Sequence, residues 1–592
     1  MLSLFFRQPR LVALAFLVIV SAGASSLLTI GRQEDPTITN LFATISTVYP
    51  GADPARVESL VTERIEAELR EVPEITVIES NSATGISVVS VELAETLTES
   101  EIDEAWDTVR REIEDARALF PVGVLEPEID TDGAGTYTAI FSLQSAGNAP
   151  PSVAPRYAEE LAQQLRRLPG TDRVQVFGAP EEEVRVTVDI HAAAAMGLSM
   201  DRIAAAVRDS DAKVQAGSLR TDRGEMLIEV EGEITALDRI RRIPLSTGMD
   251  GAVARLGDIA TVERGVRTPV SETAIVDGAP AILVAARVEP GLQVDTWMAM
   301  VREEAGDFRR ALPASLTLDQ FFDQSTYTLD RLAEVGGNMA LGVALVIAVL
   351  LVTLGLRSAV IVGLMLPVVS LASIATMQFA GMEIHQMSVT GLIVALGLLV
   401  DAAIVMADEV AKGLRHGSDR RAAVETAVRR LFGPLLASTV TTALSFMPMV
   451  LLPGPAGDFV GSIALAVIIM LFWSLATALT LTPALAGWFL RSGAGGGIRG
   501  GALARAFRWT LSWSMRHPVN AIGYALVLPL AGFLSFPTLT AQFFPGVERD
   551  QFTIEVEFPA GTAIDRTTEA IAELDAEIRA EGGIESIAWV IG

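Results

Sequence analysis

A single acidic residue lies in the middle of a long hydrophobic stretch between residues 387 and 409. Asp401 carries the sole formal charge from Met387 to Ala407. An aspartate at the centre of a membrane helix costs about 2.5–3.5 kcal/mol on insertion scales, so such residues rarely face lipid and generally serve a function. Removal from water favours the neutral acid, and a nearby cation favours the carboxylate. The sequence therefore predicts that Asp401 binds and releases a proton; a purely structural hydrogen bond is the alternative.

A second acidic residue, Asp408, follows Asp401 by seven positions. In an ideal α-helix seven residues give a rotation of about 20° and a rise of roughly 10.5 Å, so both carboxylates lie on one helical face. Asp408 is therefore predicted to relay protons at the cytoplasmic end of the helix. Because Glu409 and Lys412 adjoin it, an ordinary helix end at the membrane surface is an equally good interpretation.

Small and hydroxyl-bearing residues accompany the two acids. Gly391 and Gly397 are predicted to let neighbouring helices approach closely. Hydroxyl groups in the next hydrophobic stretch could hydrogen-bond along a proton path, although such side chains more often bond the backbone of their own helix. These hydroxyl groups belong to Ser438, Thr439, Thr441 and Thr442.

The sequence contains no motif for ATP hydrolysis or for binding a cofactor. No G-x-x-x-x-G-K motif followed by Ser or Thr occurs, so the proton-motive force is expected to replace ATP hydrolysis. The net charge of -27 comes without the clustered Lys and Arg that nucleic-acid binding requires. Cysteine is absent, and the four histidines are too far apart to predict a metal site; they are His191, His385, His416 and His517.

The hydrophobic residues, half of the 592, are concentrated in stretches long enough to cross the roughly 30 Å core of a bilayer. Seven such stretches are predicted to span it, at about 11–30, 335–355, 359–379, 387–409, 433–453, 459–490 and 518–538. A cleaved signal peptide is the alternative for the first, but its apolar run exceeds the usual 7–15 residues. The predicted domains are a first span (1–30), a periplasmic domain (31–334) with an insertion at about 181–270, spans two to six (335–490), a cytoplasmic loop (491–517), a seventh span (518–538) and the start of a second periplasmic domain (539–592).

The distribution of positive charge predicts how these spans are oriented. With a cytoplasmic N-terminus, the loops on the opposite side carry Glu383 and Asp458. This asymmetry follows the positive-inside rule and indicates an inner-membrane protein with residues 31–334 in the periplasm. The basic residues of the cytoplasmic loops are Arg357, Lys412, Arg415, Arg420, Arg421, Arg429, Arg430, Arg499, Arg505, Arg508 and Arg516.

The periplasmic region follows a strand, helix, strand pattern twice. The first unit has alternating residues at 39–48, an amphipathic helix ending at Val72-Pro73, and strands at 75–78 and 86–93. The second has a strand at 137–143, a helix ending at Pro169-Gly170 and a strand at 174–177. The predicted fold class is a polytopic α-helical membrane protein with an α+β periplasmic domain of split βαβ, ferredoxin-like subdomains.

An internal repeat relates the two ends of the chain. Arg7-Gln8-Pro9 and Arg516-His517-Pro518 precede the first and seventh spans and lie 509 positions apart. Pro50-Gly51-Ala52 and Pro559-Ala560-Gly561 show the same offset after strand-like runs. Six spans separate the copies, so the duplication is parallel, and a full second copy is expected to end near residue 1000. We therefore expect this chain to be the N-terminal portion of a longer protein.

Several motifs resemble those of one transporter family. The segment 397–405, Gly-Leu-Leu-Val-Asp-Ala-Ala-Ile-Val, resembles the fourth-helix signature of resistance-nodulation-division (RND) efflux pumps, of the multidrug type. Other similar stretches are Tyr49-Pro50-Gly51-Ala52, Phe322-Asp323-Gln324-Ser325, Ser438-Thr439-Val440-Thr441-Thr442 and Leu479-Thr480-Leu481-Thr482-Pro483-Ala484-Leu485. The resemblance implies a homotrimer in the lipid bilayer, with a periplasmic adaptor protein and an outer-membrane channel as partners. It further implies that the insertion at about 181–270 is a docking subdomain.

The substrate class stays open at this point. Export of hydrophobic or amphiphilic compounds is the first interpretation. Asp401 is followed by Ala402, whereas drug exporters of this family commonly carry two adjacent aspartates, so heavy-metal cation efflux is the alternative. A metal path would need soft ligands, and the scattered methionines weakly favour organic substrates: Met196, Met200, Met226, Met249, Met298 and Met300. A protein-export accessory subunit and a truncated membrane scaffold are further alternatives.

Overall fold

The chain divides into two compact units, each described here by itself. The first contains Met1–Gly135, Pro290–Thr296 and Ser325–Ala560, and the second contains Thr136–Glu289, Trp297–Gln324 and Gly561–Gly592. The computed structural model describes residues 4–131, 136–145, 153–210, 214–221, 224–230, 236–246, 253–490, 502–539, 550–559 and 561–592.

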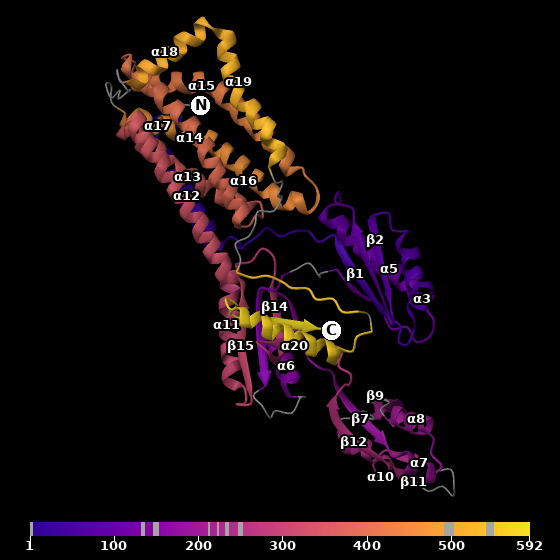
Figure 1. Ribbon diagram of the computed structural model, residues 1–592. Helices are drawn as coiled ribbons and strands as arrows, with labels where there is room; N and C mark the ends of the chain where they lie inside the picture. The colour runs from indigo at the N-terminus through magenta and orange to yellow at the C-terminus, as the bar shows by residue number, and fades with distance from the viewer. Residues whose placement is uncertain are drawn as a thin grey trace. The chain divides into compact units, whose positions relative to one another are not determined.

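The first unit contains a helical bundle (Figure 1). Within the described residues, seven helical segments are long and apolar enough to cross a membrane. They comprise α2 (Pro9–Thr29), α12 (Gln324–Leu354), α13 (Leu356–Phe379), α14 (Gln386–Arg415), α15 (Arg420–Val450), α16 (Gly454–Leu479) continued by α17 (Leu481–Phe489), and α19 (Pro518–Ser535) with the short turn η2 (Phe536–Thr538). Two further helices, α1 (Leu4–Arg7) and α18 (Ala502–Arg516), precede α2 and α19.

Local sequence explains two features of these helices. Helix α12 begins at Gln324, directly after the preceding strand, and its first turns carry Asp330, Arg331 and Glu334, so its apolar stretch starts well inside the helix. The sixth span is divided at Thr480, where φ is -117° and ψ is -69°. Pro483 has no backbone N–H and cannot complete the hydrogen bond one turn back, which accounts for the break between α16 and α17.

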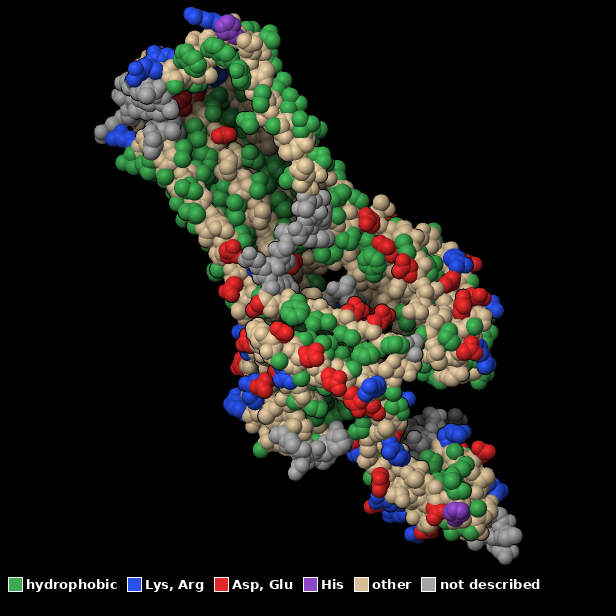
Figure 2. Space-filling view, in the orientation of Figure 1, with side chains coloured by type: hydrophobic (Ala, Val, Ile, Leu, Met, Phe, Trp, Pro, Cys, Tyr) green, Lys and Arg blue, Asp and Glu red, His purple; other side chains and the backbone are tan. Residues whose placement is uncertain are grey.

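Hydrophobic side chains from α13, α14 and α16 form the core of the bundle. Leu366 and Val369 of α13 meet Leu396 and Leu399 of α14, and Met470 of α16 closes the cluster. Figure 2 shows hydrophobic side chains along the length of the bundle, with Lys and Arg gathered at the end where α17 and α18 lie.

A sheet in the first unit has the order β2-β3-β1-β4, with every neighbouring pair antiparallel. Two helical segments cover it, and Ile45 and Val89 pair across its centre above Ile65 and Val109. This order is that of the split βαβ fold. Its elements are β1 (Phe42–Val48), α3 (Pro54–Val57), a π-helical turn (Glu58–Thr62), α4 (Glu63–Leu69), β2 (Ile75–Ala83), β3 (Ile86–Leu93), α5 (Glu99–Ala118) and β4 (Glu128–Asp130).

The second unit repeats this topology. Strand β14 pairs with β5 and β6, and β5 pairs with β15, all antiparallel. Strand β13 pairs with β14 on the side away from β5, and β16, near residue 592, pairs with β13; both pairs are antiparallel. The elements are β5 (Ala139–Ser145), α6 (Val153–Arg166), β6 (Thr171–Phe177), β13 (Thr273–Val276), β14 (Ala279–Val288), α11 (Val294–Ala311), β15 (Leu316–Asp323), α20 (Ile564–Glu581) and β16 (Ala588–Ile591).

An insertion lies between β6 and β13. Strands β7 and β12 pair antiparallel, β8 and β9 form a hairpin, and Asp189 ends β7 by capping the helix that follows. The insertion is a mixed α and β structure with its own small core around Leu256. It consists of β7 (Glu182–Val188), α7 (Ile190–Ala195), α8 (Met200–Ser210), β8 (Val214–Thr221), β9 (Gly224–Val230), α9 (Leu237–Arg241), β10 (Pro244–Ser246), β11 (Val253–Arg255), α10 (Leu256–Ile259) and β12 (Ala260–Val266).

Candidate functional site

Helix α14, which carries Asp401 and Asp408, starts at a buried cap. His385 precedes its first residue and is 4% exposed. Its Nδ1 accepts a hydrogen bond from the Ser388 N–H (3.4 Å), and the Ser388 hydroxyl oxygen accepts one from the His385 N–H (3.0 Å). The pair satisfies backbone donors that lack partners at a helix start. Burial lowers the pKa of His385 from 6.5 to about 4, so the ring is neutral at physiological pH and free to accept through Nδ1.

The start of α14 is also tied to the segment that follows α2. The Gln33 N–H donates to the Ile384 carbonyl (3.0 Å), and the Ile384 N–H donates to the Gly31 carbonyl (2.9 Å). The Gln386 N–H donates to the carbonyl of Glu34 (3.0 Å). These bonds join two chain segments more than 350 positions apart, so α14 cannot shift along its axis without moving the segment after α2.

Arg32 extends this junction to a third segment. Its N–H donates to the Leu292 carbonyl (3.1 Å), and its guanidinium forms a 3.0 Å ion pair with Asp295. Glu383, beside the cap of α14, accepts a hydrogen bond from the Gly291 backbone, yet burial outweighs that bond and raises the pKa of Glu383. Three connecting segments therefore meet at the start of α14.

One face of α14 packs closely against α16. Leu396 and Leu399 are buried there, and the Ser474 hydroxyl donates to the Leu399 carbonyl (3.0 Å). A Cβ added at Gly391 would lie 2.6 Å from the Ile463 carbonyl oxygen, closer than such atoms approach. The close helix approach predicted for Gly391 is confirmed.

The opposite face of α14 is uncovered by the described chain. Val394, Leu398 and Val405 are 44%, 39% and 44% exposed, and Asp401 lies among them at helical spacing. A Cβ at Gly397 would meet nothing within 4 Å, so the close approach predicted for Gly397 is wrong for the described residues. Gly397 instead leaves open space one turn before Asp401.

Asp401 is exposed on this open face, and no hydrogen bond or ion pair joins it to any other residue that the structure describes. Two of the hydroxyl groups considered for a proton path bond the backbone of their own helix: Thr441 donates to the Ala437 carbonyl (2.8 Å) and Thr442 to the Ser438 carbonyl (3.0 Å), both within α15. This is the behaviour expected of such residues in membrane helices. The described part of the chain thus leaves the mid-span carboxyl free to bind a proton or a cation.

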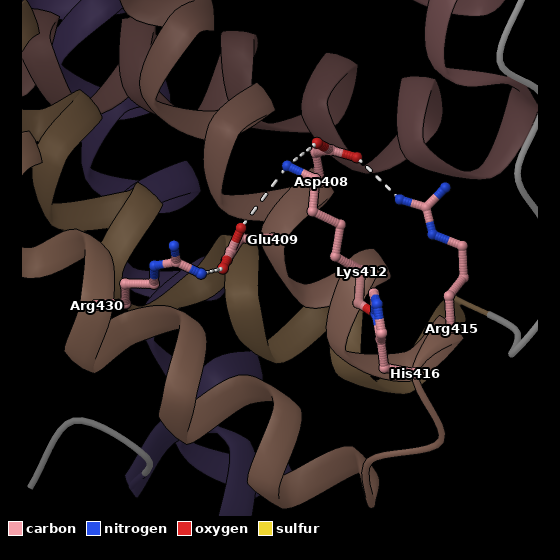
Figure 3. Close-up of polar contacts among 6 residues, drawn as sticks. All are labelled: Asp408, Glu409, Lys412, Arg415, His416 and Arg430. Atoms are coloured by element: carbon pink, nitrogen blue, oxygen red, sulfur yellow. Dashed lines mark hydrogen bonds and ion pairs between the residues drawn. The ribbon is translucent and has the colours of Figure 1, made fainter.

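Asp408 has a different environment, shown in Figure 3. Its carboxylate lies 2.8 Å from Lys412 Nζ and 3.3 Å from an Arg415 guanidinium nitrogen. Glu409 pairs with Arg430 of α15 at 2.8 Å. Cations in the last turn also interact favourably with the negative end of the helix dipole. The structure thus brings Asp408 together with cations of its own helix, and among the described residues it brings no cation to Asp401.

A group of carboxylates elsewhere has the spacing of metal ligands. Oxygen atoms of Glu68, Glu71 and Glu112 lie within 4.8 Å of one another beside α4 and α5. Glu71 is exposed, and exposed acidic groups of this kind are common without an ion. This group carries no assignment.

The whole chain matches one family of proteins. A model of the AcrB/AcrD/AcrF family covers residues 1–592. The chain belongs to this RND family. It is 23% identical over 574 residues to an uncharacterized transporter of Haemophilus influenzae, covering 95% of this chain and 55% of that protein. It is 25% identical over 528 residues to the multidrug resistance protein MdtC of Yersinia pestis and 26% identical over 530 residues to MdtC of Klebsiella pneumoniae, covering 87% of this chain and 51% of each relative.

The chain spans about half the length of the curated relatives it matches. Membership of the RND family confirms the resemblance inferred from the segment 397–405 and makes the chain a transporter-family protein rather than an enzyme. The spans and the large extramembrane α+β region agree with the predicted fold class and with an inner-membrane location.

Sequence reasoning missed several contacts of this RND chain. Spacings of four and seven residues from Asp408 to Lys412 and Arg415 were visible in the sequence and indicate neighbours on one helical face. The contact from Arg430 to Glu409 joins two helices, and no spacing rule reports it.

Proposed function

We propose that this RND protein is the inner-membrane pump of a tripartite system and exports hydrophobic or amphiphilic compounds across the cell envelope in exchange for protons. The observation that carries this proposal is Asp401, a mid-span acid that has no described partner and lies on the open face of α14. A carboxyl group in that position changes the charge of the helix face by one unit when it binds a proton. Such a change alters the free energy of burying that face, so proton binding can drive a conformational change.

In this proposal Asp401 binds the transported proton and Asp408 relays protons at the cytoplasmic end. The carboxylate of Asp408 lies beside Lys412 and Arg415 at the end of the helix, so it would act as an exchange point at the surface. The hydrogen bonds between the start of α14 and the segment 31–34 would carry a movement of α14 to the extramembrane part of the first unit.

Export of organic compounds draws support from the relatives named multidrug resistance proteins. Among the described methionines, Met298 is fully buried, whereas Met196 and Met200 are exposed on the insertion. They do not form a row of soft ligands of the kind a metal path needs. The side chain of Met226 and all of Met249 lie outside the described residues. Ala402 after Asp401 still favours heavy-metal cation efflux as a second candidate.

The partners are part of the same proposal. We infer a homotrimer that docks a periplasmic adaptor protein and an outer-membrane channel through the insertion between β6 and β13. Cross-linking at exposed Met200, replaced by cysteine in this cysteine-free chain, would test this contact. We expect a cross-linked product with the adaptor, and its absence under conditions where export is active would contradict the docking role.

The decisive experiment replaces Asp401 by Asn in the full-length protein. We expect export to stop while the amount of protein in the membrane and its assembly stay unchanged, because Asn has a similar volume but cannot bind and release a proton. Asp401→Glu, which keeps a titratable carboxyl, should retain part of the activity. Accumulation of a fluorescent amphiphile and sensitivity to silver and copper ions, measured side by side, would separate the two substrate classes.

A further inference from the structure

An apolar groove runs along the outside of α2. Its walls come from α2, α13 and α17, and its volume is about 670 Å³. All three helices belong to membrane-length segments of the first unit, so the groove lies at the depth of the acyl chains. Its walls include Ala13, Phe16 and Leu17 of α2, Leu364 of α13, and Leu485 and Trp488 of α17.

A second hollow of about 610 Å³ continues this groove toward the start of α13, where Leu356 and Arg357 line it. The two hollows share Leu364, Leu485, Trp488 and Phe489 in their walls. The second one also contains two cationic side chains, Arg357 and Arg420. The groove is therefore apolar along the membrane span and positively charged at one end.

The two arginines retain capacity to bind an anion. Arg420 donates from Nη1 to the carbonyls of Gly487 (2.9 Å) and Trp488 (2.7 Å), which fixes its guanidinium at the groove end. A guanidinium has five N–H donors, so donors remain for a ligand. Arg357 is exposed, and neither arginine forms an ion pair with a carboxylate among the described residues. Guanidinium groups bind phosphate well because their donors match its oxygen atoms.

The combination of an apolar channel and a phosphate-binding end matches one class of molecule. Eight residues of α2, between Pro9 and Ala24, line the groove over roughly 22 Å, which exceeds the roughly 15 Å of one hydrocarbon leaflet. Trp488 and Phe489 stand where the groove changes from apolar to charged, the position that aromatic residues favour at a membrane surface. We propose that this groove binds an anionic phospholipid of the cytoplasmic leaflet, with an acyl chain between α2 and α17 and the phosphate at Arg357 and Arg420.

The headgroup end is tested with the full-length protein in nanodiscs that contain phosphatidylglycerol or phosphatidylcholine with the same acyl chains. Retained lipid is counted by native mass spectrometry after detergent extraction. Two basic residues at a membrane surface predict a preference for phosphatidylglycerol of roughly 30-fold. Arg357→Gln should reduce that preference about fivefold, because it removes one of the two cations. The matched control is Arg429→Gln, an exposed arginine of α15 that does not line the groove.

The apolar end is tested by filling it. Ala13→Trp places an indole in the groove and should remove the retained lipid of either headgroup, whereas Leu14→Trp on the neighbouring, outward position should not. Equal retention of the two lipids by the unaltered protein would overturn the proposal, as would an equal loss in Arg429→Gln. If Ala13→Trp leaves retention unchanged and instead disrupts assembly, another protein segment covers the groove and the lipid assignment is wrong.

Discussion

The two faces of helix α14 have opposite properties. On one face Gly391, Leu396 and Leu399 pack against α16 with no room for an extra carbon atom at Gly391. On the other, Gly397 borders open space and Asp401 stands without a described partner. The packed face of α14 thus contributes to stability, and its open face carries the group proposed to bind protons. A change on the packed face should alter folding, and a change on the open face should alter transport.

The sharpest test of this separation compares the two acids of the open face. Asp401→Asn is expected to lower export by on the order of 100-fold or more, because a proton-binding step is removed. Asp408→Asn should lower it by only about tenfold or less, because Asp408 lies at the end of the helix, where Glu409 remains beside it as a second carboxylate that can exchange protons. Export rates of both variants, measured at equal membrane levels, check the order. A larger loss for Asp408→Asn would make the helix end, rather than the mid-span acid, the coupling site.

The cap of α14 predicts a pH dependence of stability. The folded-state pKa of His385 is about 4, below its ordinary value of 6.5, so the unfolded chain binds the proton more tightly. Stability is therefore complete above pH 6.5 and falls as the pH drops from 6.5 to 4, by about 3 kcal/mol at pH 4. Thermal unfolding at pH 7 and pH 4.5 measures the loss. His385→Asn, which keeps a capping acceptor without the titration, should lose less on acidification.

Substitution of the two glycines tests the packed and open faces directly. Gly391→Ala should destabilise the chain by about 1–3 kcal/mol, because its Cβ meets the Ile463 carbonyl at 2.6 Å. Gly397→Ala should be neutral or stabilise by up to about 1 kcal/mol, because alanine favours helix and the site is open. Urea or thermal unfolding of the two variants gives the comparison. Equal destabilisation by both would show that the second face is also packed in the folded protein.

The smallest effect is expected beside the cap. Burial raises the pKa of Glu383, so the folded state binds this proton more tightly than the unfolded chain does. Stability therefore declines as the pH rises from the ordinary pKa of a glutamate through the raised pKa of Glu383. Glu383→Gln keeps an acceptor for the Gly291 N–H and removes the buried charge. Its thermal midpoint at neutral pH should be slightly higher than that of the unaltered protein. A lower midpoint would indicate that the charge of Glu383 stabilises the junction.

Much of the fold and the position of the mid-span acid were legible from residue order. Uninterrupted apolar runs locate the spans, because a bilayer imposes a minimum length of apolar helix. Alternating patterns around Ile45 and Val89 indicate paired strands, because every second residue of a half-buried strand must be apolar. Asp401 stands out because any charge is costly at that depth.

The packed face of each helix and the partners of its charged residues could not be predicted in the same way. A membrane helix is apolar on all sides, so hydrophobicity does not tell which of Gly391 and Gly397 meets a neighbour. The ion pair of Glu409 with Arg430 and the hydrogen bonds from Arg420 to α17 depend on segments that are distant in sequence. The chain by itself determined which segments enter the membrane and that one acid goes with them. Only the tertiary structure decided which face of α14 carries Asp401 and which carboxylates the nearby cations pair with. Both depend on contacts between helices, which the order of residues within one helix does not determine.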